Sequence, residues 1–124
     1  MLFHCPKVGN FWKQIQIELK IITKQDHLLS EKTVFIGNLD TTIKNYIFVN
    51  YYILEAKAYI YSCKRKIHPP NIICFKEIIK EKCEIEKYVA FKKGIQRKFN
   101  KKWSTYIEYI NEENERDNFS PHQI

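Results

Sequence analysis

The densest group of charged side chains lies between residues 87 and 102, where the chain carries basic residues and no acid. These are Lys87, Lys92, Lys93, Arg97, Lys98, Lys101 and Lys102. One α-helix would align Lys93, Arg97 and Lys101 along a single basic stripe, because they are four residues apart. Like charges at that spacing repel each other, and a bound polyanion would relieve the repulsion.

This run predicts sequence-independent contacts with the phosphates of RNA or DNA. The expected contacts are Lys93, Arg97, Lys98, Lys101 and Lys102, followed by Lys64 and Arg65. Two alternatives stay open: Lys-rich helix faces are often only solvated, and residues 64–66 also suit the C-terminal turn of a helix. The neighbouring Phe99, Trp103 and Tyr106 would stack on bases if exposed, but their regular spacing favours a place in the core.

The residue types and spacings give little support to metal binding, cofactor binding or catalysis. Four cysteines stand singly with no CxxC pair, which predicts reduced thiols and neither a zinc site nor another cofactor; they are Cys5, Cys63, Cys74 and Cys83. Isolated glycines exclude Rossmann and P-loop folds. The acids between residues 77 and 86 alternate with lysines, which is typical of an exposed, salt-bridged helix face. We therefore expect no enzyme.

The composition indicates one compact basic domain. The 124 residues carry 21 bases and 14 acids, a net charge of +7, and four of those acids lie in residues 111–124. No apolar stretch is long enough for a membrane helix and no secretory signal is present, which predicts an intracellular protein of the nucleus or cytoplasm without a membrane partner. We expect residues 1–110 to form the domain and residues 111–124 a frayed acidic tail.

Helical periodicity organises the domain. A helix is predicted over about 7–24, and its apolar face contains Val8, Phe11, Trp12, Ile15, Leu19 and Ile22. We expect an ordered loop or a short strand near residues 33–37. Asp40 is expected to cap a second helix that ends at residues 64–66. Its apolar period runs through Ile43, Ile47, Tyr51, Leu54, Ala58 and Tyr61. Further aromatic residues surround it, so we expect it to be the central helix of the core.

A third helix begins after Asn71, its expected cap, with an inward face of Phe75, Ile78, Ile79, Ile85 and Val89. Gly94 leaves two alternatives, since either one long helix passes through it or two helices meet there. The period resumes through Ile95, Phe99, Trp103, Tyr106, Ile107 and Ile110. The predicted fold class is therefore mainly α, with three to four helices around a central aromatic-rich helix.

Several short motifs resemble the C-terminal region of LINE-type (non-LTR) retrotransposon reverse transcriptases. They are Leu2-Phe3-His4-Cys5-Pro6-Lys7-Val8 with Phe11-Trp12, then Ala56-Lys57-Ala58-Tyr59-Ile60-Tyr61-Ser62-Cys63-Lys64, Pro70 with Phe75, Glu86-Lys87-Tyr88-Val89-Ala90, and Lys101-Lys102-Trp103. The resemblance extends to about residue 110. It implies a mostly helical region that engages template RNA or target DNA beside a polymerase core.

The resemblance also implies what this sequence lacks. Cys5 would correspond to the last ligand of the family's Cys/His motif, whose other ligands precede it, so we expect no zinc site here. The polymerase aspartates and the endonuclease are absent, which implies a non-catalytic remnant. The alternative is a protein-interaction or structural fragment, or a relic without selected activity. In the fragment, the apolar face of Phe11 and Trp12 would be exposed and would bind a protein partner.

Overall fold

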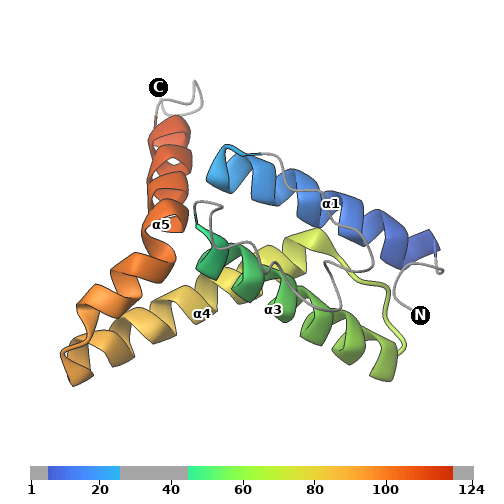
Figure 1. The fold of residues 1–124 in the computed structure, drawn as a ribbon. Coiled ribbons are helices and arrows are strands. Elements are labelled where there is room, and N and C mark those ends of the chain that lie inside the picture. Colours follow the sequence, from blue (N-terminus) through green and yellow to red (C-terminus); the bar gives the residue numbers. More distant parts are fainter. Residues whose placement is uncertain (1–5, 26–44, 119–124) are drawn as a thin grey trace.

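The computed structural model describes residues 6–25 and 45–118. Within these ranges the chain forms four α-helices, α1 (Pro6–Thr23), α3 (Tyr46–Arg65), α4 (Ile72–Lys93) and α5 (Gln96–Asn118). Figure 1 shows α1 lying across α3 and α4, with α5 rising past the end of α1. Every pair of these helices is in contact. The predicted mainly α fold is therefore confirmed, while the loop or strand expected at 33–37 lies outside the described residues.

The buried face of α1 follows the predicted spacing. Phe11, Trp12, Ile15, Leu19 and Ile22 are all buried, and Val8 packs against the edge of the core. A stripe at spacings of three and four places these side chains on one side of the helix, where α3, α4 and α5 cover them.

The helix α3 supplies the largest share of the core, but through a different face from the predicted one. Its buried residues are Phe48, Val49, Tyr52, Ile53, Ala56, Ile60 and Cys63. Leu54, Ala58 and Tyr61, which belong to the predicted period, are exposed. Apolar side chains surround most of this helix, so its sequence offers two candidate stripes. Contacts with the other three helices decide which stripe is buried.

The starts of α3 and α4 differ in how their first amide groups are satisfied. Asn45 precedes α3 in a left-handed conformation and makes no side-chain cap, and the predicted cap Asp40 lies outside the described residues. Asn71 caps α4 as predicted, because its Oδ1 accepts hydrogen bonds from the amides of Ile73 at 2.8 Å and Cys74 at 3.3 Å. The backbone N–H of Asn71 in turn donates to the Tyr59 hydroxyl at 3.0 Å.

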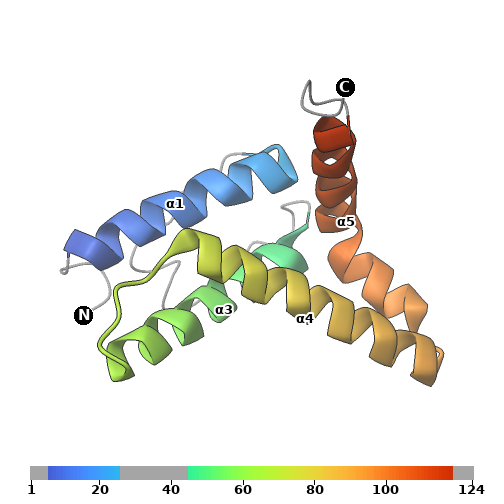
Figure 2. The same ribbon diagram turned by 180° about the vertical axis from the view of Figure 1, so that it is seen from behind.

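Gly94 separates α4 from α5, so two helices meet there. Its φ of 70° lies in the left-handed region, and its amide and that of Ile95 donate back to the carbonyls of Phe91 and Ala90. This pair of hydrogen bonds is the Schellman motif that ends many helices at glycine. The chain then turns sharply and α5 returns along α4, as Figure 2 shows from behind.

The last helix extends beyond the predicted domain boundary. Residues 111–118, expected to belong to a frayed tail, continue α5 to Asn118. Glu112 accepts from the ammonium of Lys24 at 3.2 Å, which joins this part of α5 to the end of α1. The boundary predicted at residue 110 therefore falls inside a helix, and residues 119–124 lie outside the described residues.

Across the two described ranges, none of the helices combines the length and the apolarity that crossing a bilayer requires.

Candidate nucleic-acid interface

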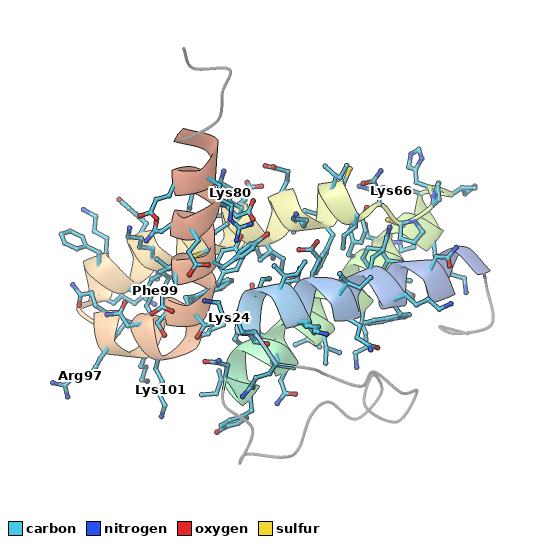
Figure 3. The ribbon with its side chains drawn as sticks, turned by 90° about the horizontal axis from the view of Figure 1, so that it is seen from above. Lys24, Lys66, Lys80, Arg97, Phe99 and Lys101 are labelled. Atoms are coloured by element: carbon cyan, nitrogen blue, oxygen red, sulfur yellow. The ribbon has the colours of Figure 1, made fainter. Side chains whose placement is uncertain are left out.

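The junction of α4 and α5 presents a group of basic side chains, which we call the elbow surface. All of its members are exposed: Lys87, Lys92 and Lys93 of α4, and Arg97, Lys98 and Lys101 of α5. Figure 3 shows Arg97 and Lys101 pointing outward from this end of the molecule, whereas Phe99 points toward the neighbouring helices. Two helix ends therefore carry one basic surface.

The continuous stripe predicted from Lys93 through Arg97 to Lys101 is wrong in its geometry. A straight helix would align these residues, but the left-handed turn at Gly94 places Lys93 on one helix and the other two on the next. The cations surround a corner instead of following a line. An anion at the corner is thus approached from two helices.

Among the described residues, none of the six elbow cations forms an ion pair with an acid. Four other lysines do pair, and their partners lie on different helices or segments: Lys24 with Glu112, Lys76 with Glu18, Lys82 with Glu55, and Lys102 with Glu86. No acid occurs between residues 87 and 102 to neutralise the elbow surface locally. Its positive potential is consequently available to a polyanion.

Lys102 is a predicted phosphate contact whose partly buried side chain lies between helices. Its ammonium donates to Glu86 at 2.8 Å and lies 3.6 Å from the centre of the Tyr51 ring. Its side chain is only 23% exposed. Burial, together with the charges of Glu55 and Glu86, raises the pKa of Tyr51 well above its ordinary value. Lys102 therefore links α4 to α5 and is not a member of the elbow surface.

Lys64 and Arg65 are exposed but lie far from the elbow. They occupy the last turn of α3, where positive charge complements the helix dipole. Figure 1 places the end of α3 and the junction of α4 and α5 at opposite ends of the molecule, and Figure 3 shows Lys66 remote from Arg97. The second basic cluster expected from the sequence therefore lies at the other end of the molecule from the first.

The aromatic residues near the basic run belong to the core. Phe99, Trp103 and Tyr106 are buried, and the Trp103 ring contacts Phe48, Tyr51 and Tyr106 with centroids 5.2 to 5.7 Å apart. Burial raises the pKa of Tyr106 above its ordinary value. The expectation of a core position is confirmed, and these rings offer no face to a base.

Two exposed aromatic residues of the elbow were missed. Tyr88 is 63% exposed and Phe91 is 69% exposed, both on the last two turns of α4. Residues Ile85 and Val89, predicted to point inward, are exposed as well, because the buried face of α4 passes through Phe75, Ile79, Cys83 and Ala90. The signal was present in the sequence: Tyr88 and Phe91 fall outside the period that Phe75 and Ile79 define.

The predicted protein-binding face of α1 is buried inside the domain. Phe11 is 1% exposed and Trp12 is 2% exposed. Phe11 packs against Tyr59 of α3 and Phe75 of α4, with ring centroids 5.5 and 5.7 Å apart. The expectation of an exposed apolar face is wrong, because α3 and α4 of the same chain cover it.

The acids Glu77, Glu81 and Glu84 of α4 are exposed as predicted, but the ion pairs that α4 makes within the described residues join it to other helices. Lys76 approaches Glu18 of α1 at 3.7 Å and Lys82 approaches Glu55 of α3 at 3.8 Å. These pairs join neighbouring helices, since the charged residues flank the buried stripe of α4 on both sides.

The cysteines are free thiols wherever the structure describes them. Cys74 is exposed, whereas Cys63 and Cys83 are buried. Burial, with the nearby charge of Glu86, raises the pKa of the Cys83 thiol to about 11. The described ranges contain no group of three or more His, Cys, Asp or Glu that would hold a metal ion. Cys5, the predicted last ligand of a truncated motif, lies outside them.

Comparison of the chain with protein-family models, with curated proteins and with solved structures finds no match.

Proposed function

We propose that this protein is a non-catalytic nucleic-acid-binding module whose elbow surface contacts phosphates. The observation that carries the proposal is the group of six exposed cations on two helices, none of which is neutralised by an acid of the described residues. Lys and Arg bind nucleic acid largely through phosphates, which requires positive charge on an accessible surface and no particular sequence. The resemblance to the C-terminal region of LINE-type reverse transcriptases points to the same class of ligand.

Salt dependence is the physical signature of this mode of binding. If about six cations engage duplex DNA, the logarithm of the binding constant falls against the logarithm of salt concentration with a slope of about −5. The measurement is fluorescence anisotropy of the purified protein with a labelled RNA or DNA at several salt concentrations. A slope near zero contradicts phosphate binding.

Two variants of equal charge test the location of the site. Arg97→Gln with Lys98→Gln and Lys101→Gln removes one arginine and two lysines from the elbow. Lys64→Gln with Arg65→Gln and Lys66→Gln removes the same residue types from the opposite end. We expect the elbow variant to bind about tenfold or more weakly at 0.1 M salt, where the Debye length is about 10 Å. Its slope of log binding constant against log salt concentration should be shallower by about 3.

The control variant should lose much less, because its charges lie far from the elbow. Equal losses from both variants would show that net charge alone attracts the ligand and would contradict the elbow assignment. All six substituted residues are exposed, so the helical circular-dichroism signal should persist in both proteins.

A protein-interaction fragment is the second candidate, on a surface other than the one expected. Tyr61, Ile67 and Ile73 are exposed around the connection from α3 to α4. Exposed apolar residues in one area are typical of a binding surface. If they mediate self-association, the mass measured by light scattering rises with protein concentration and Ile73→Ser reduces that rise. A mass that stays that of the monomer contradicts self-association.

A further inference from the structure

The last two turns of α4, which carry Lys87, Lys92 and Lys93, also expose two aromatic rings. Tyr88 and Phe91 are about two-thirds exposed, whereas Phe75 of the same helix and Phe99 and Trp103 of α5 are buried. Aromatic side chains bury large apolar areas and stabilise a core when they are covered. Two rings left open on one short stretch of helix are therefore available to a ligand.

Each exposed ring has a cation one helical turn away. Lys92 follows Tyr88 by four residues, and Lys87 precedes Phe91 by four, so each pair shares one side of the helix. The Lys92 ammonium lies 5.5 Å from the centre of the Tyr88 ring. A planar group stacked on either ring would thus have a positive charge within reach of a phosphate attached to it. This combination of stacking face and adjacent cation fits a nucleotide.

We propose that Tyr88 and Phe91 are stacking platforms for unpaired bases, so that the elbow surface binds single-stranded nucleic acid in preference to duplex. This inference rests on the function proposed above. In a duplex, the faces of the bases are already covered by their neighbours, and a protein ring gains access only where bases are unstacked. Stacking accepts every base because each has a flat π-face, so little sequence preference is expected.

The charge pattern of α4 favours this ligand over an anionic membrane. Glu81 and Glu84 precede Tyr88 by about two turns and one turn, and both are exposed. A helix that lies on a membrane presents an apolar face along much of its length, with basic residues beside it. Here the exposed aromatic residues of α4 are restricted to its last two turns, and the carboxylates before them would be repelled by anionic lipid. A strand of a few nucleotides fits a surface of this extent.

The test compares the wild-type protein with Tyr88→Leu/Phe91→Leu. Leucine keeps an apolar side chain at both positions but has no face on which a base stacks. The probes are a labelled single-stranded oligonucleotide of about 15 nucleotides and the duplex of the same sequence. Vesicles containing an anionic phospholipid form a third probe. Tyr61→Leu is the matched control, because Tyr61 is equally exposed and lies at the end of α3, remote from the elbow.

We expect the wild-type protein to bind the single strand more tightly than the duplex at the same salt concentration. The double leucine variant should lose about tenfold or more in single-strand affinity, with its salt slope and its duplex affinity unchanged. The exchange variant Tyr88→Phe/Phe91→Tyr, which keeps an aromatic ring at both positions, should bind the single strand as the wild type does. The Tyr61→Leu control should bind as the wild type does.

Three results would overturn the inference in distinguishable ways. Unchanged single-strand affinity in the double leucine variant, with a steep salt slope, contradicts stacking and leaves phosphate binding in place. Binding to vesicles that is tighter than binding to the single strand, and that the leucine variant retains, identifies a membrane as the ligand. Failure to bind either nucleic acid at low salt contradicts the proposed function itself.

Discussion

Lys101 and Lys102 are adjacent in the chain, yet their side chains have different surroundings. Lys101 is exposed on the elbow, while the Lys102 ammonium is enclosed by Glu86 and the Tyr51 ring. A helix separates neighbouring residues by about 100°, so one faces solvent and the other the groove between helices. The chemistry of a lysine here depends on its angular position.

Replacing Lys102 tests this distinction. Lys102→Met keeps the packing against Tyr51 but removes the charge-assisted hydrogen bond to Glu86, and we expect about 1 kcal/mol lower free energy of unfolding in urea. Its nucleic-acid affinity should fall less than that of Lys101→Met. Unchanged stability of Lys102→Met, together with an affinity loss equal to that of Lys101→Met, would show that Lys102 contacts the nucleic acid.

The thiols provide a second test at this scale. The raised pKa of Cys83, about 11, leaves little reactive thiolate near pH 8, and its side chain is buried, whereas Cys74 is exposed. We expect iodoacetamide to alkylate Cys74 well before Cys83 in the folded protein, and both at similar rates in urea. Mass spectrometry of the digested protein follows each site. Equal rates in the folded state would contradict the described burial of Cys83.

At the scale of elements, α3 and α4 end in the same way with different residues. In each, two amides beyond the helix donate back to its last turn, and one residue takes a positive φ. That residue is Gly94 after α4 and Ile67 after α3, with φ of 70° and 58°. The left-handed region is costly for a side chain that branches at Cβ, so the two turns differ in strain.

Gly94→Ala should destabilise the protein. No heavy atom lies within 4 Å of the Cβ that alanine would add, so the cost is confined to the backbone conformation. We expect about 1 kcal/mol less stability in urea unfolding, with the helical circular-dichroism signal retained. A stabilised variant would indicate that α4 continues into α5 as a single helix.

Ile67→Gly should have the opposite effect. Ile67 is 91% exposed, so little apolar burial is lost, and glycine removes the strain of the left-handed conformation. The larger conformational freedom of glycine in the unfolded chain offsets part of the gain. We expect a net stabilisation of about 0.5 to 1 kcal/mol in the same unfolding experiment. A loss of stability would show that Ile67 makes contacts beyond those described.

At the scale of the whole molecule, charge and aromatic content have separate locations. Acids and lysines pair between helices around the bundle, whereas the six elbow cations form no ion pair with an acid of the described residues. The interior is a continuous aromatic cluster that joins all four described helices, from Phe11 through Phe75 and Tyr52 to Phe48 and Trp103. The bundle therefore buries its aromatic residues while leaving the elbow charges exposed.

The aromatic interior predicts that the fold is sensitive to high pH. Burial raises the pKa of Tyr51, Tyr52 and Tyr106 above the ordinary value of about 10. At neutral pH these phenols are protonated in both states. Above about pH 10 the unfolded chain releases their protons and the folded protein retains them, so the free energy of unfolding falls as pH rises.

Urea unfolding between about pH 8 and about pH 11 measures this fall. Tyr106→Phe removes one of the buried phenols and should make the decline shallower. A stability that stays constant over this range would contradict the burial of the tyrosine hydroxyls.

Much of the local structure could be predicted from the sequence. The α1 stripe through Phe11, Ile15 and Leu19 is buried as expected, and Asn71 caps α4, because a single apolar stripe and a capping amide are local signals. The mainly α class and the core position of Trp103 also followed from periodicity. The basic character of residues 87–102 is likewise a property of the sequence alone.

Only the tertiary structure decided how these parts are used. The sequence of α3 is apolar on most sides, so its own period did not select the buried face, and the three partner helices did. The turn at Gly94 folds α5 back onto α4, which turns the predicted stripe into a corner. Lys102 pairs with Glu86 on another helix, a contact that spacing along the chain does not reveal. Each of these outcomes depends on long-range contacts, whereas periodicity and capping report only on neighbours along the chain.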